Sequence, residues 1–186
     1  MKLAGDYKFE APPADVWKAL LDPEVLAAVM PGCEKLELVD DAYVGELNIK
    51  VGPVQGKFQG KVILADVEDE KGYTMTVDGR GQPGFVKAKA AVRLSPEGAD
   101  TRMEYDADAQ VGGRIASVGQ RLIDSSARAI IKESLEGQNA NVKALAATAE
   151  GEKAEVILTD QAEFTKKVAK EVANDLIPPN ARKALI

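Results

Sequence analysis

The chain has no histidine among its 186 residues. Catalytic Ser-His and Cys-His pairs and the common zinc sites depend on an imidazole ring, so the sequence excludes these arrangements. Any chemistry of its own would have to rest on carboxylates, lysine, tyrosine or the single cysteine, Cys33. The absence of histidine therefore argues against a hydrolase or a zinc enzyme.

Cysteine and long apolar runs are also scarce. A single cysteine excludes an internal disulfide and fits a reducing compartment. The apolar runs last only a few residues, which is too short to span a membrane. The first residues, MKLAGDYKFE, lack the apolar segment of a secretory signal, so we expect a cytoplasmic protein. A net charge of −6, without clustered Lys and Arg, argues against nucleic acid as a partner.

Most of the sequence alternates between apolar and polar residues. Residues 2–10 alternate and predict a half-buried strand. Prolines open the segments 14–21 and 23–30, which predicts two short helices. Residues 34–111 then follow a period of two, interrupted only by short links such as residues 70–72. Strands joined this closely must be antiparallel neighbours, and here they share one dry face.

The segment that follows the strands predicts a helix that covers this dry face. From Arg114 a helical period places Ile115, Leu122 and Ser126 on one apolar arc, and the helical pattern continues to about Ala149. The predicted fold class is α+β. It consists of a curved antiparallel sheet of about seven strands around a long C-terminal helix, with two short helices after the first strand. We assign residues 1–149 to this domain.

The remaining residues predict a linker and an amphipathic docking segment. The linker covers residues 150–159, in which residues 156–158 are apolar enough to pair as a short strand. Asp160 caps a final helix, with Glu163 at the capping-box position, and the docking segment covers residues 160–186. From 160 to 175, three Lys stand against two Glu and two Asp, which sums to −1. Because this charge does not favour an anionic membrane, we expect docking on protein more than on lipid.

Small residues are frequent on the dry face of the sheet and on the helix that covers it. Glycines and alanines of the strands face Gly119, Ser126 and Ala129 of the helix. Such residues either draw the two layers together or leave a void, and the pattern leaves both open. Glu133 lies at nearly the same helical angle as Leu122. Because an unpaired buried carboxylate is unfavourable, Glu133 lies either at an opening of the interior, beside water or a polar group of a ligand, or in solvent beyond the point where the helix leaves the sheet.

Two other sets of residues could suggest a catalytic site, but their positions in the predicted fold explain them better. Cys33 has no nearby cation except Lys35, so we interpret it as a small buried hydrophobe and not as a nucleophile. Glu104, Asp106 and Asp108 follow a period of two, which places all three on the wet face of one strand. They are therefore not a catalytic pair of carboxylates.

Four motifs occur in an order that resembles one known family. They are APPADVWKALLDPEVL at 11–26, PGCE at 31–34, VGPVQGKFQGKV at 51–62 and VGGRIASVGQRL at 111–122. Together they resemble the CoxG family, the G subunit of carbon monoxide dehydrogenase, over residues 1 to about 145. The resemblance implies a START-like (SRPBCC) helix-grip fold with an apolar cavity between sheet and helix.

The same resemblance implies a function. It implies a non-catalytic accessory protein that binds a lipophilic molecule, a quinone, and has no covalently bound cofactor and no metal. The partners would be the subunits of a molybdenum hydroxylase of the CO dehydrogenase type. The protein would act as a membrane-recruitment or electron-transfer adaptor, with peripheral contact at the inner face of the membrane. Members often end in a strongly hydrophobic tail, whereas the tail of this chain is only mildly amphipathic.

Inward positions of the strands and of the helix over 114–131 define the expected cavity wall. These positions are Tyr43, Leu47, Phe58, Val62, Met75, Val77, Val92, Met103, Tyr105, Leu122 and Ser126. A cyclase or aromatase-like enzyme acting on a hydrophobic substrate in this cavity is an alternative, as is a docking module whose cavity is filled. An enzyme would need several converging polar groups. The inward set offers only the tyrosines 43, 73 and 105, Ser126 and Glu133, which favours binding.

Overall fold

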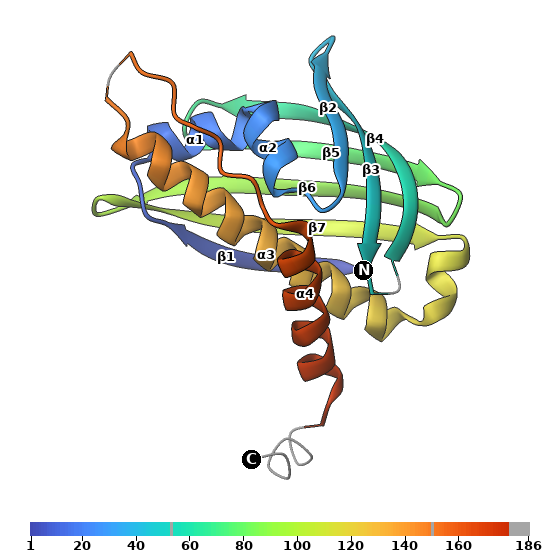
Figure 1. Ribbon diagram of the computed structural model, residues 1–186. Coiled ribbons are helices and arrows are strands. Elements are labelled where there is room, and N and C mark those ends of the chain that lie inside the picture. The colour runs from blue at the N-terminus through green and yellow to red at the C-terminus, as the bar shows by residue number, and fades with distance from the viewer. Residues whose placement is uncertain (53, 150, 179–186) are drawn as a thin grey trace.

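The computed structural model describes residues 1–52, 54–149 and 151–178 (Figure 1). Pro53, Glu150 and the part of the expected docking segment after residue 178 lie outside the described residues. The described strands form one seven-stranded antiparallel sheet in the order β1-β7-β6-β5-β4-β3-β2. Their bounds are β1 Lys2–Phe9, β2 Cys33–Val39, β3 Ala42–Val51, β4 Val54–Glu68, β5 Gly72–Gly81, β6 Gly84–Glu97 and β7 Asp100–Gly112. The predicted antiparallel pairing of successive strands is confirmed from β2 to β7, and the structure adds the pairing of β1 with β7.

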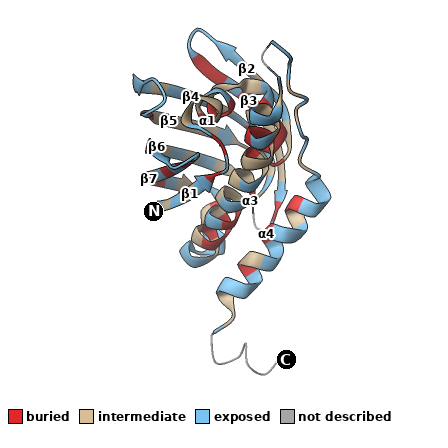
Figure 2. Ribbon diagram, turned by 90° about the vertical axis from the view of Figure 1, so that its left-hand side faces the viewer, coloured by how far each residue is buried: buried red, intermediate tan, exposed pale blue. Residues whose placement is uncertain are grey.

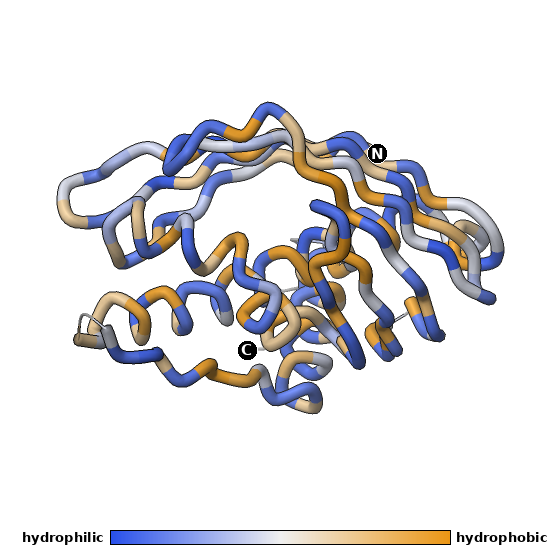
Figure 3. The backbone as a smooth tube through the Cα atoms, turned by 90° about the horizontal axis from the view of Figure 1, so that it is seen from above, coloured by the Kyte–Doolittle hydropathy of each residue, from blue (hydrophilic) through white to orange (hydrophobic). Residues whose placement is uncertain are grey.

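The helices lie on one side of this sheet, which arches over them (Figure 3). Two short helices follow β1, and a long helix follows β7, as the sequence predicts. The bounds are α1 Pro13–Leu21, α2 Pro23–Val29, the 3-10 helix η1 Arg114–Val118, α3 Gln120–Ala147 and α4 Gln161–Leu176. Proline opens both short helices, and the Asp22 carboxylate caps α2 by accepting from the Glu24 N–H at 2.8 Å. The α+β fold class is confirmed.

The long helix does not begin at Arg114 as the sequence suggested. Residues 114–118 form η1, and Gly119, with φ at +100°, separates it from α3. A Cβ at Gly119 would meet no atom within 4 Å, so the backbone conformation requires glycine there and packing does not. Gly119 is therefore a joint between two helices and not part of an apolar helix face.

The apolar interior is divided into two clusters. The first lies where α1 and the C-terminal half of α3 meet the sheet, and its fully buried members include Phe9, Val16 and Val142. The second lies where α4 packs against α3 and the end of β3, and it contains Val51, Ala129, Phe164, Val168 and Val172. The sheet is therefore held to its helices at two separate places.

The segment between α3 and α4 lies extended along the helices and forms no strand over residues 151–160. The side chain of Asn141 makes the hydrogen bonds to this segment that a neighbouring strand would otherwise make. Its Nδ2 donates to the Ile157 carbonyl at 3.0 Å, and its Oδ1 accepts from the Ile157 N–H at 2.7 Å. The Thr159 N–H also donates to the Ala28 carbonyl at 3.0 Å. These bonds satisfy backbone groups that the sequence pattern assigned to strand pairing.

Helix α4 packs on the chain's own domain (Figure 2). Asp160 caps it as predicted, because its carboxylate accepts from the Glu163 N–H at 2.8 Å. Phe164, Val168 and Val172 are buried in the second cluster. The Lys132 ammonium lies 2.6 Å from a Glu171 carboxylate oxygen, which adds an ion pair between α3 and α4.

We predict that Phe164→Ala destabilises the fold. The side chain is 2 % exposed, so its removal leaves a cavity between α3, α4 and β3. Such a truncation lowers the free energy of unfolding by about 3–5 kcal/mol. Urea unfolding measures the loss, and Lys170→Ala, at an exposed position of the same helix, is the control. Equal stability of the two variants would show that α4 does not pack in this way in solution.

Candidate functional site

The strand residues expected to form the cavity wall all point to the concave face of the sheet. Tyr43 pairs with Val62, and Val62 pairs with Val77. Leu47 pairs with Phe58 in the next row. Directly paired residues project to the same face. The remaining strand residues of the set follow the same alternation, namely Met75, Val92, Met103 and Tyr105.

These residues differ in how well they are covered. Val92 and Met103 are buried in the first cluster, and Met75 and Tyr105 pack against it. Tyr43 and Phe58 are buried outside the two clusters. Three others are only half-buried although they point inward, and among the described residues they belong to neither cluster: Leu47, Val62 and Val77. The middle of the concave face is therefore incompletely covered.

Two paired glycines extend this uncovered area. Gly60 of β4 lies opposite Gly79 of β5. A Cβ at Gly60 would have the Asp78 carbonyl oxygen as its nearest atom, at 3.9 Å, and one at Gly79 would be 3.8 Å from the Val86 carbonyl oxygen. Neither would meet a side chain within 4 Å, and neither glycine has a positive φ. Backbone geometry does not require glycine at these positions, so what the glycines provide is space.

Gly56, three residues after the β3–β4 turn, has a different role. Its φ is +134°, and a Cβ there would clash with the ring of Pro83. Glycine is therefore required at this position by conformation and by close approach. Gly56 therefore marks a bend in β4, whereas Gly60 does not.

The two helix residues of the expected wall lie toward other neighbours. Leu122 packs against the second cluster, beside α4. Ser126 is fully buried below the β3–β4 turn, where a Cβ on Gly52 would lie 3.9 Å from its Oγ. The Oγ atoms of Ser125 and Ser126 have no hydrogen-bond partner within the described chain. Small residues on this part of α3 thus allow close approach of α4 and of the β3–β4 turn.

The tyrosines of the concave face are protonated donors at neutral pH. The Tyr43 hydroxyl donates to the Leu21 carbonyl at 2.6 Å, and burial raises its pKa. Burial, with a smaller contribution from Tyr43, raises the pKa of Tyr73 to about 12. Burial also raises the pKa of Tyr105, whose ring lies against Gly5. Phenols with raised pKa values are poorly suited to proton abstraction near neutral pH.

Glu133 faces α4. It is 7 % exposed, and its carboxylate lies 3.8 Å from the Lys167 ammonium. Burial, followed by the nearby charge of Glu136, raises its pKa, and Lys167 partly opposes this shift. Glu133 lines a pocket of about 310 Å³ between α3, α4 and residues 157–160. It therefore serves the junction of the two helices and lies neither on the concave face nor in free solvent.

The alternative chemical sites gain no support. Cys33 is half-buried, and burial raises the pKa of its thiol, which disfavours the nucleophilic thiolate. Glu104, Asp106 and Asp108 are exposed on the outer face of β7. Within the described ranges, no three Cys, Asp or Glu side chains are close enough together to hold a metal ion.

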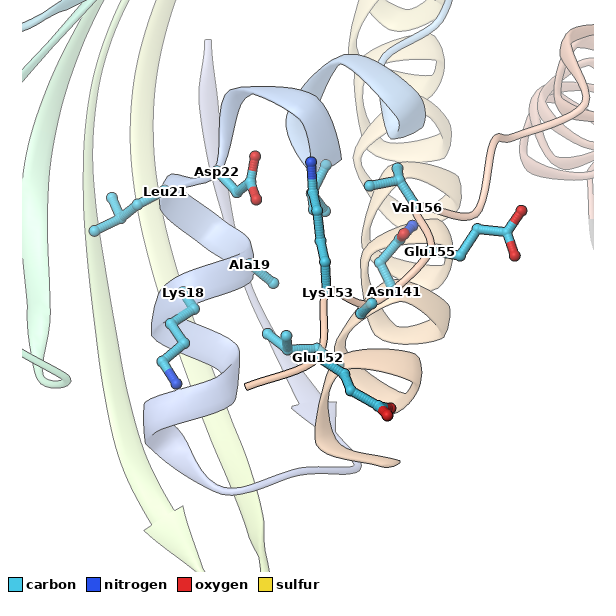
Figure 4. A pocket seen from close by; sticks show the side chains of 12 residues that line it. Lys18, Ala19, Leu21, Asp22, Asn141, Glu152, Lys153, Glu155 and Val156 are labelled. Carbon is cyan, nitrogen blue, oxygen red and sulfur yellow. The ribbon is translucent and has the colours of Figure 1, made fainter. Parts of the chain in front are cut away.

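A pocket that the sequence does not predict lies between α1 and the segment that follows α3 (Figure 4). It measures about 480 Å³ and is bounded by α1, α2, the end of α3 and residues 152–156. Lys153 crosses it toward α2, where its ammonium lies 3.1 Å from Glu24. Its lining combines apolar residues such as Val25 and Leu145 with charges of both signs, so it favours no particular class of ligand. Residues 152–156, which form one wall of this pocket, belong to the predicted linker. The periodicity of the sequence does not indicate that a linker packs against α1 and α2.

A curved antiparallel sheet that holds a long C-terminal helix defines a START-like protein, and solved structures show the same fold. A START superfamily protein from Mycobacterium smegmatis is 10 % identical, with a TM-score of 0.60 over 76 % of this chain and 97 % of its own. A protein from Thermus thermophilus is 16 % identical, with a TM-score of 0.61 over 79 % and 100 %. A conserved protein from Geobacillus kaustophilus is 30 % identical, with a TM-score of 0.74 over 77 % and 95 %.

The family is identified by sequence. The family model of CoxG, the G subunit of carbon monoxide dehydrogenase, matches residues 5–144, and the chain belongs to this family. The resemblance seen in the four motifs is thereby confirmed. Membership implies an accessory role in the carbon monoxide dehydrogenase system. No curated protein matches the chain. No helix within the described ranges is long and apolar enough to cross a membrane.

We predict that Glu133→Gln changes the pH dependence of stability. A carboxyl whose pKa is raised by folding stabilises the folded state at low pH, and this contribution is lost as the pH rises above the unfolded value. The variant should therefore gain stability relative to the parent as the pH rises above the ordinary carboxyl value of 4.5, as measured by urea unfolding. Loss of the half-exposed Lys167 pair has a small effect.

Glu163→Gln is the matched control, since the exposed Glu163 carboxylate also pairs with Lys167, at 3.2 Å. It should not reproduce the gain. A Glu133→Gln variant that is less stable than the parent at neutral pH would contradict the expected direction.

Proposed function

We propose that this protein is a non-catalytic accessory factor that binds a lipophilic small molecule, a quinone, against the concave face of the sheet. The observation that carries the proposal is the division of the interior into two clusters, with half-buried inward residues between them. Gly60 and Gly79 add open space at the same place. A chain that needed only a solid core would fill this area with larger side chains.

The chemistry of this face suits a quinone. Leu47, Val62 and Val77 offer apolar contact to a ring or an isoprenoid chain. Burial of a few hundred Å² of apolar ligand surface is worth several kcal/mol at about 25 cal/mol per Å². The contact proposed here is apolar, because the Tyr105 hydroxyl lies over Gly5 of β1 and the Tyr43 hydroxyl donates to the Leu21 carbonyl.

The same residues favour binding over catalysis. A cyclase or aromatase-like enzyme needs groups that take up and release protons near neutral pH. The concave face offers tyrosines with raised pKa values and no histidine. A docking module with a filled interior is also disfavoured, because side chains at Gly60 and Gly79 would meet open space.

Family membership supports a role for the bound quinone in electron transfer or membrane recruitment. CoxG proteins belong to the carbon monoxide dehydrogenase system, and a quinone is an electron acceptor that resides in membranes. We propose that the protein serves a molybdenum hydroxylase of this type as an adaptor for electron transfer or membrane recruitment. It would work in the cytoplasm, with peripheral contact at the inner face of the membrane.

Gly79→Leu is predicted to block binding of a quinone analogue without loss of stability. The new side chain would project into the open part of the concave face, where its Cβ meets no side chain within 4 Å. Binding should fall at least tenfold, which corresponds to about 1.4 kcal/mol. Fluorescence titration measures binding, and thermal unfolding measures stability.

Thr76→Leu is the matched control, because residue 76 belongs to the same strand and is exposed on the outer face. It should bind as the parent does. Mass spectrometry of the extracted analogue should recover it chemically unchanged. Unaltered binding by Gly79→Leu, or conversion of the analogue, would refute the binding role as proposed.

The C-terminal segment is predicted to contribute little to lipid binding. The apolar stripe of α4 is buried on its own domain, and the charges over residues 160–175 sum to −1. Co-sedimentation with anionic phospholipid vesicles should therefore be weak for the full chain and for a chain that ends at residue 149, whose folding is checked by circular dichroism because it lacks the α4 side chains of the second cluster. Strong binding by the full chain alone would show that α4 leaves its domain for the membrane.

A further inference from the structure

Strand β2 is a free edge of the sheet. It pairs with β3 on one side, and no described strand pairs with its other side. Lys35, Glu37, Leu38 and Val39 are exposed along it. An open edge presents unpaired N–H and C=O groups, to which another strand can add.

Exposed apolar residues gather at this edge. Leu38 is 53 % exposed and Val39 is 46 % exposed. Leu38 pairs with Tyr43 and lies on the concave face, whereas Val39 pairs with Ala42, which pairs with Ile63, so Val39 and Ile63 share the outer face of the sheet. Ile63 is 46 % exposed, and Val44, two residues after Ala42 on the same face, is 43 % exposed. A contiguous apolar area beside an open edge is typical of an interaction surface.

The charges of β2 are complementary to those of a second copy of the same strand. Lys35 and Glu37 flank Leu36, and their charged groups lie 3.3 Å apart. If two copies of β2 pair antiparallel about Leu36, Lys35 of each copy faces Glu37 of the other. Opposite charges directly across a strand pair stabilise it, and the two-fold symmetry forms this contact twice.

The other edge of the sheet lacks this property. The charged residues of β1 are engaged by neighbours in the same chain. Lys2 lies 3.3 Å from Asp108, Lys8 lies 3.2 Å from Asp100, and Asp6 lies 3.1 Å from Arg102. The N-terminal part of the chain is further tied to α3 through Glu10, which accepts from Asn139 at 3.1 Å.

We propose that the protein forms a homodimer through antiparallel pairing of β2 with β2 of a second copy, about a two-fold axis at Leu36. The pairing joins the two seven-stranded sheets into one, with both concave faces open on the same side. Paired charges on an edge strand usually deter association, but here they select one partner and one register. The seven-residue strand is short. The interface is therefore smaller than the usual range of about 1,200–2,000 Å², and the dimer is weak and concentration-dependent.

Sedimentation velocity on the full chain over a range of concentrations tests this. The parent should change from monomer to dimer as concentration rises. Lys35→Glu places two pairs of carboxylates across the axis and should weaken dimerisation by about tenfold or more, because like charges replace both complementary contacts. Lys35→Glu with Glu37→Lys reverses both charges, restores the complementary pairs and should restore the dimer.

Lys61→Glu is the control, since it makes the same charge change at an exposed position of β4 away from the edge. It should dimerise as the parent does, and thermal unfolding should show that all four proteins are folded. A parent that is monomeric at every concentration would overturn the proposal. So would a double variant that fails to recover the dimer, because Lys35 and Glu37 would then not face each other across the axis.

Discussion

One long helix must cover the dry face of seven strands, and the rest of the structure depends on this constraint. Seven strands about 4.8 Å apart form a sheet roughly 30 Å wide, whereas a helix is about 10 Å across. Bending of the sheet reduces the mismatch without removing it (Figure 3). Helices α1 and α2 cover one flank, and α4 covers the seam between α3 and the end of β3. What remains between them is the partly covered area around Val62, Val77 and the paired glycines.

The second of the two clusters depends on residues outside the family match. The match ends at residue 144, and the similar solved structures cover less than four fifths of this chain while accounting for nearly all of their own. Phe164, Val168 and Val172 lie beyond that limit. Without α4, Val51 and Ala129 would lose most of their apolar partners. The C-terminal segment is thus an integral part of this molecule's interior.

The alternation of residues predicts the strands and their inward positions, because an antiparallel sheet with one dry face imposes a period of two. The short links predict the pairing of successive strands from β2 to β7, but nothing in the pattern predicts the pairing of β1 with β7. Periodicity also identifies the apolar arc of α3. It does not identify what that arc contacts, since a second helix and a sheet require the same apolar residues. Leu122 and Ser126 were therefore expected on the concave face and are found beside α4 and the β3–β4 turn. The side-chain amide of Asn141 binds the backbone of Ile157, which lies in a separate segment. The pattern of apolar and polar residues does not predict this contact.

Because glycines stand on either side of η1, the direction of α3 does not depend on the direction of β7. Gly113 and Gly119 have φ values of +83° and +100°, so the chain changes course twice within a few residues. A continuous helix would transmit the tilt of the last strand along its whole length. Here the tilt is interrupted, and the position of α3 is set by side-chain contacts, among them those of Asn139 and Lys143 with Glu10. In the proposed binding role, a small rotation at these two residues would accommodate ligands of different thickness with no change in the pairing of the strands.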